Sequence, residues 1–432
     1  MRIFIIGQCS LHWGRMENGN IGNYYIVEPL VRELHRVFPQ AELVTTMQMT
    51  EEFQKRENIK VVPMELYYAW KDDDLEIAQK EYEIAKKFND TGILEKTTPF
   101  IDEVLKSDLI IDFSGDMWGA NADLAGENRF TVGLLKNRTV QLLNKKNVLF
   151  LVSPGPFNEK NLNFAKEVYE NFDLVVLREP ISMNLLKKWG FNTCKTEYGA
   201  CQSVLFEKSP QREIEKFIEN TPLKNKKDFI VGFTICGWNM LKGPFNRDNF
   251  QDNEFQNYVD MIEYLCKDLN AKVCLFSHSN GFNLPPNFKL IHGRDFPLVK
   301  KIYDLIQTKD YKDNVFLLED IYLPKNIKTI INNFDMLISG RVHCAIAGLS
   351  NCIPTVIIDY GHEPKAHKLQ GFAKLYGIED FIANPADLEN LINKIKKCYS
   401  NKDNIKLELK DKVQQIKQQS MNSTQLIKER VL

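Results

Sequence analysis

Ten short apolar segments recur along the chain, and none shows the polar-apolar alternation of a half-exposed strand. They span residues 2–6, 41–45, 109–113, 147–152, 174–177, 230–234, 272–276, 315–318, 336–339 and 355–358. Strands of this kind are buried on both faces, as in a parallel sheet covered by helices. Segments with helical periodicity lie between them, at 24–37, 100–106, 161–171 and 255–269. The alternation predicts an α/β fold of parallel sheets flanked by helices, with right-handed crossovers.

The predicted strands fall into two groups, which indicates two domains. Between the groups lies a densely charged segment, 207–228, that contains Pro210 and Pro222. Such a composition is typical of a connection. We therefore predict two Rossmann-like domains, 1–206 and 229–393, that face each other across a cleft. A chain of 432 residues is long enough for both.

The last segment, 394–432, is predicted to be a basic helical region. It carries ten basic and four acidic residues, and its apolar residues recur at helical spacing. We expect the apolar side to pack on the protein, with the helix crossing back to the first domain. Contact of the basic side with anionic lipid is the alternative that the charge leaves open.

The overall composition excludes several classes of protein. The balance of 56 basic and 57 acidic residues argues against nucleic-acid binding by bulk charge. Nine cysteines, an odd number without CxxC spacing, indicate thiols in a reducing compartment and no zinc ribbon. The apolar run at 2–6 is too short for a signal peptide, and no stretch approaches the 18 apolar residues of a membrane span. We predict a cytoplasmic protein, with contact to the inner face of a membrane left open.

The most informative segment follows the predicted strand 336–339. Gly340 allows a sharp turn, Arg341 and His343 come next, and a helix is predicted from Val342 onward. Ligands of open α/β sheets bind at the carboxyl ends of the strands. Free backbone N–H groups at a helix start favour an anion, and Arg341 adds a planar fork for carboxylate or phosphate. His343 is the member of this cluster that can give and take a proton near neutral pH.

The loop after the next predicted strand, 355–358, is rich in protonatable side chains. It contains Tyr360, His362, Lys365 and His367. Such a loop suits the binding of an anionic group. The spacing of the two histidines matches no zinc motif, so no metal site is predicted.

Together these segments resemble the polysaccharide pyruvyl transferase family. The resemblance lies in Gly340-Arg341-Val342-His343, in the small-residue helix that follows, in the Ile353-Pro354 turn, and in Tyr360 and Lys365. Weaker matches occur upstream, in the order expected for the family: Gly19-Asn20-Ile21-Gly22-Asn23, Ser114-Gly115 after a strand, and Arg178-Glu179 with Ser182. The resemblance implies two Rossmann-like domains of GT-B type and the transfer of a pyruvyl group from phosphoenolpyruvate to two sugar hydroxyls as a ketal.

The resemblance also implies roles for particular residues. His343 would act as acid or base, and Arg341, Arg178 and Lys365 would hold the carboxylate and phosphate of the donor. Tyr360, Gly22, Asn23 and Gly115 would help to bind substrate, with 1–206 as the acceptor side and 229–393 as the donor side. His278 follows a predicted strand, a position that suits contact with the donor or, as the alternative, a capping or core role. No cofactor or metal is implied beyond phosphoenolpyruvate as donor substrate. The partners would be this donor and a glycan or lipid-linked sugar acceptor, with no nucleic acid.

Two departures from the family pattern leave the chemistry open. The family usually shows consecutive glycines where this chain reads Gly115-Asp116-Met117-Trp118-Gly119, and an Asp where it reads Tyr198-Gly199-Ala200. The alternatives are a nucleotide-sugar glycosyltransferase, with Asp359 as the nearest acidic residue for a ribose, and a non-catalytic relative that binds glycan or anion. The oligomeric state is not predicted.

Overall fold

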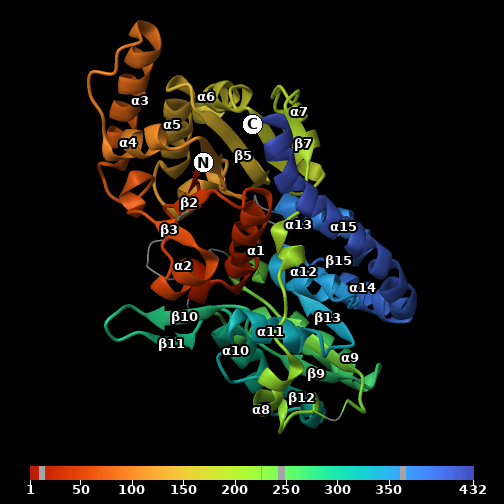
Figure 1. Ribbon diagram of the computed structural model, residues 1–432. Coiled ribbons are helices and arrows are strands. Elements are labelled where there is room, and N and C mark those ends of the chain that lie inside the picture. The colour runs from red at the N-terminus through yellow and green to blue at the C-terminus, as the bar shows by residue number, and fades with distance from the viewer. Residues whose placement is uncertain (9–14, 225, 242–248, 361–365) are drawn as a thin grey trace. The chain divides into compact units, whose positions relative to one another are not determined.

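The computed structural model describes the chain except for residues 9–14, 225, 242–248 and 361–365. It divides into two compact units. Unit 1 comprises Met1–Met16, Val27–Gln202 and Gln418–Leu432, and unit 2 comprises Glu17–Ile26 and Ser203–Lys417. Each unit is built on a parallel sheet flanked by helices (Figure 1).

In the described residues, unit 1 holds a seven-stranded sheet in which all neighbouring strands are parallel. Its spatial order is β3 (Ile59–Val61), β2 (Glu42–Thr45), β1 (Arg2–Ile6), β4 (Leu109–Asp112), β5 (Lys146–Val152), β6 (Leu174–Leu177) and β7 (Thr196–Tyr198). The direction of winding reverses between β1 and β4. Such a switch point is where open α/β sheets bind ligands.

The part of unit 2 that the structure describes holds a six-stranded parallel sheet with the same winding. Its order is β12 (Val315–Leu317), β9 (Lys272–Leu275), β8 (Ile230–Thr234), β13 (Met336–Ser339), β14 (Thr355–Ile358) and β15 (Ile382–Ala383). Its switch point lies between β8 and β13. A separate antiparallel hairpin, β10 (Asn280–Asn283) and β11 (Lys289–His292), follows β9.

Helices connect the strands in both units. Those of unit 1 are α2 (Glu51–Glu57), α3 (Asp74–Thr91), α4 (Pro99–Lys106), α5 (Arg129–Leu142), α6 (Glu159–Glu170) and α7 (Ile181–Lys188). Those of unit 2 are α8 (Glu215–Ile218), α9 (Gln256–Lys267), α10 (Phe296–Ile306), α11 (Pro324–Ile331), α12 (Val342–Ser350), α13 (Ala366–Tyr376) and α14 (Leu388–Ser400). Two helices, α1 (Ile21–Val37) and α15 (Lys402–Arg430), contribute residues to both units. Side-chain caps start several of them, as Thr98 does before Pro99 in α4.

All ten predicted strands are present, with ends that differ by at most one residue. Strands such as β6, β8 and β13 are buried along their whole length, which is why their sequences are continuously apolar. The four predicted helices are also confirmed, as α1, α4, α6 and α9. Five strands in the described residues were not predicted: β3, β7 and β15, which are three of the four outer strands of the two sheets, and the two strands of the hairpin.

The division into units differs from the predicted boundaries in one important place. Residues Glu17–Ile26 belong to unit 2, although they lie inside the predicted first domain. The physical reason is that Tyr25 is fully buried there: its hydroxyl donates to the carbonyl of Pro324 at 3.1 Å, and its ring stacks on Phe206. Gly22 and Asn23, which lie inside the predicted first domain, are therefore part of unit 2.

The segment predicted as a connection, 207–228, also packs within unit 2. The Ser209 hydroxyl lies 3.0 Å from that of Thr329, and Ser209 N donates to the carbonyl of Lys325. The end of α15 belongs to unit 1, where Ala200 N donates to the Ser423 hydroxyl at 3.3 Å.

The apolar side of α15 is covered by protein. Its buried residues include Ile405, Leu409, Val413, Ile416 and Ile427. That side of the helix is thus unavailable for contact with lipid. Among the described residues, no helix is both long and apolar enough to cross a membrane.

Candidate functional site

Four adjacent strands of the unit 2 sheet end at one edge, and each is followed by a polar side chain. His278 follows β9, Asn239 follows β8, Arg341 follows β13 and Tyr360 follows β14. Because β9, β8, β13 and β14 are neighbours in that order, the fold gathers residues that are more than 120 positions apart in the chain. Arg341 lies at the switch point between β8 and β13.

Arg341 is held by a carboxylate that the sequence analysis did not single out. Its Nε donates to Asp295 Oδ2 at 2.9 Å, and its Nη2 donates to Asp295 Oδ1 at 2.5 Å. Asp295 is fully buried, whereas the Arg341 side chain remains 19% exposed. A two-point pair of this kind fixes the plane of the guanidinium. The sequence predicts a guanidinium that wholly faces a ligand, but two of its five N–H groups bond to Asp295. The N–H groups not used by Asp295 are the two of Nη1 and one of Nη2.

The pair also sets the charge of its surroundings. Burial lowers the pKa of Arg341, but the attraction of Asp295 outweighs it, so the net pKa is raised and the guanidinium stays charged. Burial raises the pKa of the nearby Cys236 to about 11, despite the opposing effect of Arg341. The Cys236 thiol therefore stays protonated, and it donates to the carbonyl of Gly340 at 3.3 Å.

Asn239 ties three strand ends together. Its side-chain oxygen accepts from Cys236 N at 2.9 Å, and its Nδ2 donates to the carbonyl of Ile358 at 3.1 Å. A Cβ on Gly340 would lie only 2.0 Å from Asn239 Oδ1, so this position requires glycine. The turn before Arg341 is thereby held against the ends of β8 and β14.

His343 lies in the first turn of α12 and packs against the N-terminal glycine loop. A Cβ on Gly22 would approach His343 Nδ1 to 2.8 Å and His343 Cβ to 2.9 Å, so only glycine fits at this contact. The ring of Phe372 meets the imidazole edge to face, with centroids 6.2 Å apart. The imidazole is only partly buried. Gly22 and His343, predicted separately, are therefore direct neighbours.

Asn20 holds the segment Glu17–Ile26 in place next to the Gly22–His343 contact. The side chain of Asn20 accepts from Gly22 N at 3.0 Å and so caps α1, and Asn23 N donates to the carbonyl of Asn20 at 2.9 Å. Asn20 also forms an isolated antiparallel bridge with Ser279, which follows His278 directly.

His278 is buried and neutral. It is 1% exposed, and the ring of Tyr25 meets it edge to face at 5.4 Å. Burial, with a further contribution from the Arg341 charge, lowers its pKa to about 3. Its Nε2 has no hydrogen-bond partner among the described residues. A buried nitrogen of this kind retains the capacity for one hydrogen bond.

The loop after β14 is described only at its start. Tyr360 is buried beside Trp238, with ring centroids 6.1 Å apart, and its N donates to Asp359 Oδ1 at 2.8 Å. The ammonium of Lys368 lies 5.9 Å from the Tyr360 ring. Lys365 and His362 lie outside the described residues.

Unit 1 has a buried arginine, Arg178, among residues that follow β4, β5 and β6. Arg178 follows β6 and is 3% exposed. Its Nε donates to the Ser153 hydroxyl at 2.8 Å, and its Nη2 lies 3.7 Å from Asp116 Oδ1. Gly115, with φ of +65°, lies under the guanidinium: a Cβ there would be 3.3 Å from Nη1. The structure thus joins Gly115 to Arg178 in unit 1, and Gly22 to His343 in unit 2.

The departure at 115–119 has a structural explanation. Trp118 is 2% exposed and its ring lies among those of Phe130, Phe157 and Tyr169. Where the family usually has glycine, this chain therefore places a core side chain. Asp116, the neighbouring departure, provides the carboxylate nearest to Arg178 of those described.

Three residues of this arrangement were missed by the sequence analysis. Asp295 precedes a helix with proline at its second position, so it is easily taken for an ordinary helix start. Asn239 follows a predicted strand and a glycine, which is the same signal that identified Arg341. Tyr25 looked like one more apolar residue of a helix.

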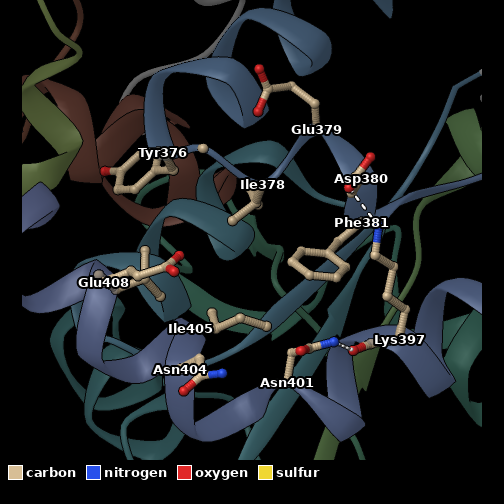
Figure 2. A pocket seen from close by; sticks show the side chains of 12 residues that line it. Tyr376, Ile378, Glu379, Asp380, Phe381, Lys397, Asn401, Asn404, Ile405 and Glu408 are labelled. Atoms are coloured by element: carbon tan, nitrogen blue, oxygen red, sulfur yellow. Dashed lines mark hydrogen bonds and ion pairs between the residues drawn. The ribbon is translucent and has the colours of Figure 1, made fainter.

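A pocket of about 540 Å³ lies elsewhere in unit 2 (Figure 2). It is bordered by the end of α13 and by α14 and α15, and contains none of the predicted site residues. Within it Lys397 pairs with Asp380 at 2.5 Å, and Asn401 donates to the carbonyl of Lys397. We assign it no part in group transfer. In the described ranges, no three His, Cys, Asp or Glu side chains are grouped so as to hold a metal ion.

The chemistry available at the unit 2 edge follows from these contacts. Arg341 offers a charged, oriented donor for an anion, and His343 offers a proton donor or acceptor beside it. The helix start at α12 adds backbone N–H groups. An anionic substrate that must be oriented and protonated would suit this edge.

Comparisons with known proteins point in the same direction. The amylovoran biosynthesis protein AmsJ of Erwinia amylovora is 22% identical over 433 residues, which cover 96% of both chains. Among solved structures, HepE of Anabaena in complex with UDP has a TM-score of 0.56 at 14% identity over 99% of both chains. A glycosyltransferase of Rickettsia africae has a TM-score of 0.58 at 12% identity, covering 98% of this chain and 95% of that one.

A UDP-GlcNAc 2-epimerase of Neisseria meningitidis bound to UDP-GlcNAc has a TM-score of 0.55 at 11% identity, covering 100% of this chain and 99% of that one. At such identities these structures show the fold alone, which is that of GT-B glycosyltransferases and epimerases. Residues 20–362 match the family described as polysaccharide pyruvyl transferase. The matched range holds most of the chain and all of the predicted site residues except Lys365. The chain belongs to the polysaccharide pyruvyl transferase family, and the protein is a transferase.

Proposed function

We propose that the protein transfers the pyruvyl group of phosphoenolpyruvate to two hydroxyls of a sugar, in a glycan or its precursor, and so forms a pyruvate ketal. The observation that carries this proposal is the contact at the edge of unit 2: a partly exposed His343, packed on Gly22, in the same turn as the charged and oriented Arg341. Family membership supports the class of reaction.

The reaction needs a proton, an anion site and a base. Protonation of the donor methylene makes it a methyl group and leaves the adjacent carbon electron-poor. A sugar hydroxyl adds to that carbon and gives up its proton. The bond from this carbon to the phosphate oxygen then breaks, and phosphate leaves with the electron pair. A second hydroxyl adds, gives up its proton and closes the ketal.

The described residues suit these steps. We assign His343 to the transfer of a proton, since its imidazole can both donate and accept near neutral pH. We assign Arg341 to the carboxylate or phosphate of the donor, with Asp295 as a positioning residue that holds the guanidinium plane. His278 Nε2 would form one hydrogen bond with phosphoenolpyruvate. Arg178 is proposed as a second cationic anchor, and Lys365 as a third.

Calorimetry with phosphoenolpyruvate tests the donor assignment. Wild-type protein should bind it, and Arg341→Gln should weaken binding about tenfold or more, as expected for the loss of a charge-assisted hydrogen bond of roughly 1.5–3 kcal/mol. His343→Asn should bind the donor and lose turnover. Lys397→Ala, in the separate pocket of unit 2, is the matched control and should behave as wild type.

Turnover can be followed once a screen of methyl glycosides has found an acceptor. Each ketal should release one phosphate, and in D₂O its methyl group should carry one deuterium from the protonation step. A product with no deuterium in the methyl group, or phosphoenolpyruvate binding that is unaffected by Arg341→Gln, would contradict the assignment.

The second candidate is a glycosyltransferase that uses a UDP-sugar. It is favoured by one observation: the structurally similar HepE was solved with UDP. The same calorimeter distinguishes the two, since binding of UDP without binding of phosphoenolpyruvate would support the glycosyltransferase.

A further inference from the structure

The hairpin β10–β11 is an addition to the parallel sheet of unit 2. It is inserted between β9 and α10 and pairs with itself in antiparallel register, outside the six-stranded sheet. In Figure 1 it projects from unit 2 as a narrow arm. A two-stranded hairpin has little stability alone, so an arm of this kind calls for a function outside the core.

One face of the arm is apolar in its outer part, beyond the pair Asn280 and His292 at its base. Phe282 pairs directly with Leu290, and the alternation of strand side chains puts Leu284 and Phe288 on the same face. The Phe282 and Phe288 rings lie 6.0 Å apart. Exposure increases toward the tip: Phe282 and Leu290 are half-buried, whereas Phe288 is 42% and Leu284 47% exposed. A contiguous exposed apolar face marks an interaction site.

The charge of the arm identifies what the face would meet. No acidic residue occurs from position 269 to 294, and Lys289, at the tip end of β11, is an exposed cation. The acidic Glu319 and Asp320 act on His292, at the base of the hairpin and not at its tip. An apolar tip with only positive charge is complementary to the surface of an anionic lipid bilayer.

Both ends of the arm are rooted in the candidate site. Its first strand begins two residues after His278, and its second is followed by Asp295, the partner of Arg341. Asp295 N donates to the Ser279 hydroxyl at 3.1 Å. Gly293 lies so close to the backbone of Ser279 that a Cβ would be 2.4 Å from its carbonyl oxygen. The base of the arm is therefore held tightly against the Arg341 cluster.

We propose that the hairpin β10–β11 is a docking arm for an anionic membrane surface, which inserts Leu284 and Phe288 among the lipid headgroups. Docking brings the edge of unit 2 to the layer in which a lipid-linked sugar presents its hydroxyls. This consequence for the acceptor rests on the proposed function, but the docking itself does not.

Flotation with lipid vesicles tests the arm in the full-length protein. Wild type should float with vesicles of equal parts phosphatidylglycerol and phosphatidylcholine, and far less with phosphatidylcholine alone. Leu284→Ser with Phe288→Ser should lower the bound fraction about tenfold or more, because most of the inserted apolar area is lost. Lys289→Glu should lower it about fivefold or more, since one basic residue near such a surface contributes roughly 1 kcal/mol.

The matched control is Ile93→Ser with Leu407→Ser, which removes two apolar side chains that are 63% and 66% exposed elsewhere on the chain. It should float like wild type. Equal loss in this control, or no flotation of wild type, would overturn the proposal. So would dimerisation of wild type in light scattering that the hairpin variant abolishes, because the face would then be a contact between two copies.

Calorimetry separates this proposal from the proposed function. The hairpin variant should bind phosphoenolpyruvate as wild type does, since Leu284 and Phe288 lie at the far end of the arm. If wild type floats but does not bind phosphoenolpyruvate, the docking arm is supported and the proposed donor is refuted. If it binds phosphoenolpyruvate but does not float, the donor is supported and the docking arm is refuted.

Discussion

The two units each place an arginine after a parallel strand, but they hold it in different ways. In unit 2, Arg341 is paired through two nitrogens with the fully buried Asp295. In unit 1, Arg178 makes a 2.8 Å hydrogen bond to the neutral Ser153 hydroxyl, and its Nη2 lies 3.7 Å from Asp116 Oδ1. The first arginine is held through two nitrogens by one buried carboxylate, whereas the second is more deeply buried and its Nε is bonded to a hydroxyl.

The two arrangements suit two different tasks, although the sequence pattern around the two arginines is the same. A guanidinium held in one plane by a buried carboxylate is suited to aligning a substrate. One whose Nε is bonded to a neutral hydroxyl, as in unit 1, is suited to attracting an anion by its charge. The shared signal, an arginine after an apolar strand, identifies the position in both units but not the task.

The largest difference between the two arginines should appear in stability. Arg341→Ala leaves the Asp295 carboxylate buried without its partner, which costs about 3–5 kcal/mol. Arg178→Ala removes one hydrogen bond and leaves Asp116, which is 19% exposed, in contact with water, so about 1–2 kcal/mol is expected. Urea unfolding measures both.

The double variant Arg341→Ala with Asp295→Ala is the control for this comparison. It should recover part of the lost stability, because the unpaired charge is gone. Equal losses for the two single arginine variants would show that the two environments do not differ as described.

A medium effect of pH is expected from His278, whose pKa is lowered by burial and in part by the Arg341 charge. His278 has a pKa of about 3 in the folded protein and an ordinary value of 6.5. As pH falls below 6.5 the unfolded chain takes up a proton that the folded protein refuses, so stability is full above this pH and declines toward pH 3. At pH 5 the loss is about 2 kcal/mol, from 1.5 pH units at 1.36 kcal/mol each.

Urea midpoints at about pH 5 and about pH 7 check this effect. His278→Gln should reduce the difference between the two midpoints. His35→Gln is the control, since His35 is half-buried in unit 1 and contacts the carbonyls of Glu57 and Asn58. A pH dependence that His278→Gln leaves unchanged would refute the buried neutral histidine.

The smallest effects should come from the glycine beside each cluster. Gly115→Ala must adopt a φ of +65° and should cost about 1 kcal/mol of stability with little change in turnover. Gly22 has no such φ, but its new Cβ would lie 2.8 Å from His343 Nδ1, so Gly22→Ala should lower turnover about tenfold by displacing the imidazole. Unfolding and phosphate-release assays on both variants check this prediction. A larger loss of turnover in Gly115→Ala than in Gly22→Ala would contradict the assigned contacts.

The sequence was sufficient to predict most of the fold. Strands such as 174–177 and 336–339 are buried on both faces, so their residues carry the signal locally. The outer strand β7 reads Thr-Glu-Tyr and is recognisable only from its pairing with β6. The hairpin was missed for a related reason, because its two strands support only each other.

The candidate site was predictable where a single segment carries the signal. Arg341 and His343 stand together after a strand, so the sequence places both. Asp295 lies 46 positions from Arg341 in the chain, and Gly22 is 321 positions from His343. Such pairs depend on how the strands are ordered in the sheet, which no local pattern specifies.

The burial of Tyr25 in unit 2 has a consequence for how the protein is made. Its hydroxyl meets the carbonyl of Pro324, 299 positions later in the chain. At a synthesis rate of 5–20 residues per second, Tyr25 would wait roughly 15–60 s for this partner to leave the ribosome. Over that time the start of α1 lacks the partners that bury Tyr25, and the Gly22–His343 contact does not exist. The Gly22–His343 contact can therefore form only after His343, at position 343 of 432, has been made.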